Sequence, residues 1–257
     1  MIDLHSHVLP GLDDGARDLK AALEMCRTAA ADGIEVLAAT PHVRADFPTT
    51  PQAMSEALRQ VREAAAGLID VVPGGEIDIH ELERPVDELL PFALAGNPAY
   101  LLVETPYAGW PLDFPDRLFR LRMVGITPVL AHPERNRDVQ VRPALLEPIV
   151  AGGGLVQLTA ASLAGRGGRR AKACADALLE RGLAHLIASD AHGPGLREVG
   201  LTSAAQAVGY DLGRWLTVDV PRAIVDAEPI PPRPRQPSRR RRLLERSFRP
   251  RPSRRAQ

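Results

Sequence analysis

Short apolar runs alternate with helical patterns along most of the chain, and this alternation limits the available folds more than any other feature. Seven runs of four to six residues precede stretches with helical periodicity. The runs that we expect to be strands are residues 2–5, 35–40, 69–73, 99–104, 127–131, 155–159 and 184–189. Such alternation predicts βαβ units around a parallel sheet, and seven units in about 228 residues favour a closed or nearly closed barrel.

Helices are expected between and after these strands. Their ranges are 18–32, 51–67, 81–94, 115–124, 143–151, 169–181, 196–208 and 221–226. Gly33, Gly125 and Gly182 directly follow three of them and indicate helix ends, because glycine readily adopts the left-handed conformation of a C-cap. We therefore expect one α/β domain over residues 1–228.

Residue types that bind metals lie at the carboxyl ends of the expected strands. His5 and His7 end the first run two residues apart, so their side chains share a face. The complete set is His5, His7, Asp14, His42, Glu76, Glu104, His132, Asp190 and His192. In a β/α barrel these ends converge on one face, where active sites are built. His80 and His185 fall elsewhere and are left out.

The chemistry of this set predicts bound cations. Several acids buried together would have strongly raised pKa values unless positive charge neutralised them. Nine ligands exceed the three or four that one catalytic ion takes from protein, so two or three divalent ions are implied, with Glu76 or Glu104 bridging. Nitrogen and oxygen ligands without thiolate fit Mn, Fe or Zn. Considered alone, Asp14 could be simply a turn residue, and Glu104 could simply cap a helix.

The net charge of zero conceals two unlike parts. Residues 229–257 contain eleven Arg, seven Pro and one acid, which leaves 21 basic and 31 acidic residues in residues 1–228. A segment so rich in Pro and Arg cannot bury a core, and we expect it to be a disordered tail. Its charge suits an anionic membrane surface or nucleic acid as partner.

No apolar run approaches the ~18 residues of a membrane helix, and the chain starts directly with its first strand. We therefore expect a cytoplasmic protein. Its two cysteines, Cys26 and Cys174, lie in helical patterns. The residues six positions after them are Asp32 and Glu180, whereas a cysteine-dependent tyrosine phosphatase has Arg there, so a thiol mechanism is disfavoured.

The order and spacing of the motifs over roughly residues 1–228 resemble the polymerase and histidinol phosphatase (PHP) superfamily. Within it, they are most similar to the bacterial manganese-dependent tyrosine-protein phosphatases of capsule and exopolysaccharide clusters. The motifs are His5-Ser6-His7, Leu12-Asp13-Asp14-Gly15, Ala39-Thr40-Pro41-His42, Gly75-Glu76-Ile77, Leu102-Val103-Glu104, Ala131-His132-Pro133-Glu134-Arg135 and Ala188-Ser189-Asp190-Ala191-His192. The basic tail has no counterpart in the resemblance.

The resemblance implies a distorted seven-stranded β/α barrel and a trinuclear metal site in which all nine residues above are ligands. Manganese is the metal that the resemblance favours. It further implies that Arg135 and Arg197 hold phosphate, which suits the bidentate donors of a guanidinium. Asp190 is expected to act in catalysis as well. The implied reaction is metal-assisted hydrolysis of protein phosphotyrosine, on the tail of a bacterial tyrosine autokinase.

Other readings stay open at this point. Either arginine could pair with a surface acid, and Tyr107 and Trp110 could line the mouth of the site or pack beneath it. A small-molecule phosphatase of the histidinol-phosphatase type and a PHP exonuclease share the fold. A noncatalytic metal-binding scaffold with a recruiting tail is disfavoured, because a degenerate site should have lost ligands.

Overall fold

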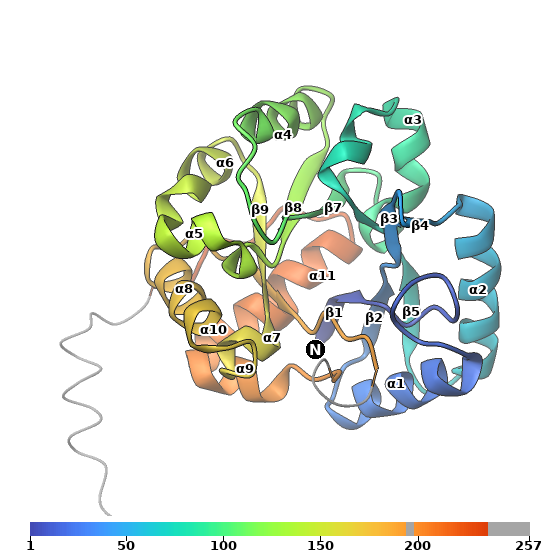
Figure 1. Cartoon of the computed structure of the whole chain (residues 1–257). Coiled ribbons are helices and arrows are strands. Elements are labelled where there is room, and N and C mark those ends of the chain that lie inside the picture. Colours follow the sequence, from blue (N-terminus) through green and yellow to red (C-terminus); the bar gives the residue numbers. More distant parts are fainter. Residues whose placement is uncertain (194–197, 236–257) are drawn as a thin grey trace, which may run out of the picture.

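Two sheets with parallel strands form the centre of the protein, as seen in a computed structural model that describes residues 1–193 and 198–235 (Figure 1). The first sheet has the order β1 (Ile2–Ser6), β2 (Val36–Ala39), β5 (Asp70–Pro73). The second has the order β10 (Leu186–Ala188), β9 (Leu155–Thr159), β8 (Thr127–Ala131), β7 (Tyr100–Glu104), β6 (Glu76–Ile77), β3 (His42–Arg44), β4 (Phe47–Pro48). Only β4 pairs antiparallel among these described strands.

The two sheets meet along the chain and through hydrogen bonds. Residues 40–41 connect β2 to β3, and Gly74 and Gly75 connect β5 to β6. A Cβ atom on Gly75 would lie 2.8 Å from Cβ of Phe92, so only glycine fits there. On the other side, a parallel bridge joins Ser6 to Ala191. The α/β class is confirmed, while closure into a seven-stranded barrel stays a prediction.

Most of the helices lie around the outside of the strands, and the last one crosses the middle of the view (Figure 1). They are α1 (Leu19–Ala31), α2 (Pro51–Ala64), α3 (Val86–Leu89), α4 (Phe114–Met123), α5 (Arg137–Val141), α6 (Glu147–Ala151), α7 (Ala160–Leu163), α8 (Arg169–Glu180), α9 (Thr202–Val208), α10 (Tyr210–Arg214) and α11 (Val220–Val225). Cys26 in α1 and Cys174 in α8 are buried, and burial raises the pKa of their thiols to about 11 and about 12. Neither is therefore a thiolate, as the sequence predicted.

All seven expected strands are present, but some helices differ from expectation. The prediction of a single helix at 81–94 is wrong, because short 3-10 turns and α3 occupy this range. Pro85 and Pro91 explain the breaks, because proline lacks the N–H that a helix interior requires. The helix expected to begin at residue 196 begins at Thr202, and residues 194–197 lie outside the described part of the chain.

The first residues of the expected tail contact the body. The Trp215 indole donates to Pro231 O (3.0 Å), and the Arg233 guanidinium donates to Ala184 O (2.8 Å) and Leu179 O (2.9 Å). Contacts of the domain therefore extend past residue 228, up to at least Arg233. Residues 236–257 lie outside the described range. Within residues 1–193 and 198–235, no helix combines the length and apolarity needed to cross a bilayer.

Candidate metal centre

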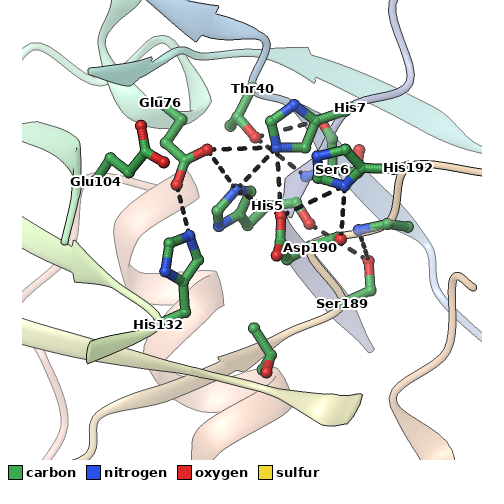
Figure 2. A network of polar contacts seen from close by, with 12 residues as sticks. His5, Ser6, His7, Thr40, Glu76, Glu104, His132, Ser189, Asp190 and His192 are labelled. Atoms are coloured by element: carbon green, nitrogen blue, oxygen red, sulfur yellow. Dashed lines mark hydrogen bonds and ion pairs between the residues drawn. The ribbon is translucent and has the colours of Figure 1, made fainter. Parts of the chain in front are cut away.

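His5 and His7 occupy the centre of the site, at the carboxyl end of β1 (Figure 2). Their Nε2 atoms lie 3.2 Å apart, and both side chains are fully buried. Each Nε2 also lies 3.3–3.4 Å from Glu76 Oε2 and 3.3 Å from Asp190 Oδ1. Four ligand-type atoms thus converge on one small volume with no apolar group between them.

The predicted residues fall into three overlapping groups, in each of which the ligand atoms lie within 4.8 Å of one another. The groups are His5, His7, Glu76 and Asp190; His7, Asp14, His42 and His192; and His42, Glu76 and Glu104. His7, His42 and Glu76 each belong to two groups. This sharing is what closely spaced ions with bridging ligands require.

His132 stands outside these groups but contacts the same centre. Its Nε2 lies 2.8 Å from Glu76 Oε1, and its Nδ1 is buried with no hydrogen-bond partner in the described part of the chain. His132 and Asp190 have φ values of +39° and +53°. Non-glycine residues rarely adopt this left-handed region, and each costs of the order of 1–3 kcal/mol. The surrounding structure therefore holds both side chains toward the site against a backbone preference.

The pKa values reflect mutual stabilisation of opposite charges. Burial alone would lower the pKa of His5, but Glu76 and Asp190 raise it above its usual value. Burial would likewise raise the pKa values of Glu76 and Asp190, yet the neighbouring imidazoles, led by His5, hold both well below the usual range. The pKa of Glu104 is raised by burial and by the Glu76 charge. The site is therefore built for ionised acids that need cationic partners.

The donor set fits divalent ions. Glu76 Oε2 faces nitrogens of His5, His7 and His42 at 3.1–3.4 Å, yet it makes no hydrogen bond within the described residues. An orphaned, fully buried carboxylate oxygen among imidazole nitrogens is costly in a protein interior. It is the arrangement expected of an atom that coordinates a cation, with nitrogen and oxygen ligands and no thiolate.

Asp13, which the sequence analysis did not select, orients this cluster. Its Oδ2 accepts hydrogen bonds from His7 Nδ1 (2.7 Å) and from the backbone N–H of His42 (3.0 Å). Although burial acts to raise the pKa of Asp13, the hydrogen bond from His7 lowers it to about 2. A Cβ on Gly15 would lie 2.1 Å from His7 O, so the Asp-Asp-Gly turn must end in glycine. The carboxylate fixes which His7 nitrogen faces the centre.

Gln157, Asp3 and Arg44 support other members of the cluster and were also missed. Gln157 Oε1 lies 3.0 Å from His5 Nδ1, and Asp3 accepts from the backbone N–H groups of His5 and Ser189. Arg44 donates to Glu104 Oε1 at 3.1 Å. The signals available in the sequence were the polar Gln157 between Val156 and Leu158 and the acidic Asp3 between Ile2 and Leu4.

The two arginines predicted to hold phosphate have different outcomes. Arg135 lies beside the cluster, where its guanidinium donates to Asp190 Oδ2. Burial would lower the pKa of Arg135, but the Asp190 charge raises it, so the guanidinium is always protonated. Arg197 lies outside the described residues.

Together, the fold and the cluster define an α/β protein with a candidate multi-ion centre at the carboxyl ends of its strands. The chain belongs to the capsular polysaccharide synthesis CpsB/CapC family, whose model matches residues 1–222. It is 34% identical over 252 residues to tyrosine-protein phosphatase YwqE of Bacillus subtilis (strain 168), with 95% of this chain and 99% of that protein covered. It is 28% identical over 240 residues to tyrosine-protein phosphatase CpsB of Streptococcus pneumoniae, with 88% and 98% covered.

A solved structure gives the same result. It is described as one of the crystal structures of YwqE from Bacillus subtilis and CpsB from Streptococcus pneumoniae, "unique metal-dependent tyrosine phosphatases". It matches with a TM-score of 0.84 and 34% sequence identity, over 93% of this chain and 100% of that chain. The family predicted from the sequence motifs is therefore confirmed.

Proposed function

We propose that this protein is a metal-dependent phosphatase that hydrolyses phosphotyrosine in proteins. The observation that carries the proposal is the convergence of three overlapping ligand groups that share His7, His42 and Glu76. The names of relatives that align over nearly their whole length support the choice of phosphotyrosine.

All nine residues of the predicted set are proposed as ligands of two or three divalent ions, with Mn first and Fe or Zn as alternatives. Glu76 is placed to bridge, because its two oxygens face different histidines. When bound, such ions activate a water molecule and place positive charge against the phosphoryl oxygens. Asp13 and Gln157 orient the imidazoles that hold the ions.

Arg135 is proposed to position the phosphoryl group. Asp190 accepts a hydrogen bond from one of its nitrogens, and a guanidinium has further N–H donors that suit two phosphoryl oxygens. We propose the same role for Arg197. Asp190 then has two functions, since one oxygen faces His5 and His7 while the other orients Arg135.

We also propose that the two sheets act together as a distorted seven-stranded barrel. The runs β2 to β3 and β5 to β6 then count as two broken strands, and the Ser6–Ala191 bridge joins the first strand to the last. This arrangement supports the proposal because it would bring every strand end of the predicted set to one rim.

The substrate is proposed to be the phosphorylated tail of a bacterial tyrosine autokinase that controls capsule or exopolysaccharide synthesis. Support comes from the family's description as capsular polysaccharide synthesis proteins. The proposal places the enzyme in the cytoplasm at the inner membrane face, with the arginine-rich tail on anionic lipid. A variant in which Arg239–Arg242 are replaced with glutamine keeps Arg233 and should no longer sediment with anionic liposomes. Unchanged sedimentation would contradict the proposed membrane contact. Binding to DNA instead would assign the tail to nucleic acid.

One experiment tests the activity against its rivals. We expect kcat/KM with added Mn²⁺ to be highest for a phosphotyrosine peptide, compared with histidinol phosphate and a short DNA strand, and to be lost with chelator. Equal or faster turnover of histidinol phosphate would overturn the choice of substrate. Full activity with chelator would overturn the metal-dependent mechanism, and no turnover of any substrate would favour the scaffold.

A further inference from the structure

Two aromatic rings each stand parallel to a proposed ligand imidazole. The Tyr107 ring is stacked with His132 at a centroid distance of 5.9 Å and an interplanar angle of 13°. The Phe47 ring is stacked with His42 at 5.6 Å and 14°. His132 and His42 contact different oxygens of Glu76, at 2.8 Å and 3.1 Å. Each ring therefore stands next to an imidazole that contacts Glu76.

Tyr107 is exposed although its backbone is fixed. Its side chain is 47% exposed. Its carbonyl accepts a hydrogen bond from the N–H of Arg137 (3.1 Å), and Asn136 Nδ2 donates to Pro106 O (2.7 Å) and Gly109 O (3.0 Å). The loop is thus fastened beside Arg135, the proposed phosphate-binding residue. A rigidly held ring with apolar area in solvent offers a stacking surface at little entropic cost.

Phe47 is fixed on a separate element. It lies in the β3–β4 hairpin, where it pairs with Arg44, whose guanidinium lies 5.2 Å from the ring centroid. Phe47 lies in β4 and Tyr107 in the loop after β7, and strands β6 and β3 lie between β7 and β4, so three strand spacings of ~4.8 Å separate the backbones of β7 and β4 by roughly 14 Å. The two rings therefore come from separate elements and do not form one aromatic cluster.

We propose that Tyr107, assisted by Phe47, is a specificity-determining residue that selects aryl over alkyl phosphate esters by stacking on the aromatic ring of the substrate. The inference rests on the proposed phosphatase function and deepens it. A phosphotyrosine ring can stack on the exposed ring of Tyr107, whereas the methylene of phosphoserine has no face to offer. The stacking energy is gained only by the aryl substrate and therefore appears as discrimination between the two.

The test compares Tyr107→Leu, Tyr107→Phe and Phe47→Leu in the full-length, Mn-loaded protein. The substrates are a phosphotyrosine peptide and a phosphoserine peptide of otherwise identical sequence. For Tyr107→Leu we expect kcat/KM to fall about tenfold on phosphotyrosine and to stay unchanged on phosphoserine. Phe47→Leu should show a smaller selective loss, and Tyr107→Phe should keep wild-type selectivity. Tyr210→Leu, the same substitution at an exposed tyrosine on α10, should alter neither rate.

A binding measurement separates this inference from the proposed function. Calorimetry with phenylphosphonate and methylphosphonate measures ring stacking without any hydrolysis. If the wild type hydrolysed neither peptide, only the phosphatase proposal would be contradicted. We expect Tyr107→Leu to weaken phenylphosphonate about tenfold and to leave methylphosphonate unchanged. Equal losses for both ligands, or loss of bound metal in Tyr107→Leu, would show that the ring only supports His132. Wild-type affinities in that variant would likewise overturn the inference.

Discussion

The two ends of the strands use histidine in opposite ways. At the carboxyl ends, His5 and His7 face carboxylates, and these acids raise the imidazole pKa values. At the amino end of β10, His185 faces no carboxylate among the described residues: its Nδ1 accepts the backbone N–H of Val156 (3.2 Å), and its ring lies beside Trp215. Burial and the nearby Arg233 charge lower the pKa of His185 to about 4.

The contrast shows what distinguishes a candidate ligand from a structural histidine. His185 has its acceptor nitrogen satisfied by the backbone and remains neutral near pH 7. The carboxyl-end histidines have nitrogens that face one another or an orphaned carboxylate oxygen. Only the second environment gains free energy from a cation, so changes at the two ends should have separable effects on activity and stability.

The largest effect is expected for Asp190→Asn. This substitution keeps the shape of the side chain but removes the charge that faces His5, His7 and Arg135. The variant loses the charge of a proposed metal ligand and the partner that orients Arg135, so kcat/KM on a phosphotyrosine peptide should fall about 10³-fold. The matched control is Asp176→Asn, because Asp176 forms an exposed ion pair with Lys172 on α8. Full activity of Asp190→Asn would show that the site is misassigned.

A smaller effect is expected for Asp13→Asn, which acts through His7. The variant replaces the charge that fixes the His7 ring, and supporting residues of this kind alter metal affinity about 10–100-fold. Competition with a fluorescent chelator measures the change. Unaltered Mn²⁺ affinity would remove Asp13 from the centre.

At the other end, His185→Gln should change stability and not kcat. The pKa of His185 is about 4 in the folded protein, below the usual 6.5 of an exposed histidine, so the neutral ring stabilises the fold above pH 6.5, and this stability is lost as the pH falls toward 4. By pH 5 the loss is about 2 kcal/mol. The free energies of unfolding of the wild type and the variant, measured with urea, should therefore lie closer together at pH 5 than at pH 7.5, by about 2 kcal/mol. A difference independent of pH would contradict the assigned pKa.

The smallest effect is expected for Arg233→Gln. The variant loses the donors to Ala184 O and Leu179 O and the cation over Trp215, so the free energy of unfolding should fall by about 1 kcal/mol. Arg235→Gln, at an exposed neighbour, should leave it unchanged. A drop in metal content of Arg233→Gln would break the separation of the two ends.

Sequence reasoning located the candidate site well because parallel strands carry their positional information in the chain itself. Once the apolar runs are recognised, His42, Glu76 and Asp190 follow from where each run ends, and eight of the nine predicted ligands fall in the ligand groups. The location of His185 at the opposite end followed from the same rule.

The rest depends on neighbours that a pattern does not contain. Asp13 orients His7 through a side-chain conformation, and its role is invisible beside Asp14 in the same turn. Strands of two or three residues, such as β6 and β3, are too short for periodicity to detect. The helix expected at 81–94 has a helical pattern of apolar residues, but its two prolines decide the backbone conformation.

Metal content measures the central claim most directly. We would load the wild type, Glu76→Gln and His185→Gln with Mn²⁺, remove free ions by dialysis, and count ions per chain by mass spectrometry. The account predicts two or three ions in the wild type and in His185→Gln, and at least one fewer in Glu76→Gln. A wild type without bound ions, or a Glu76→Gln variant that retains them all, would contradict it.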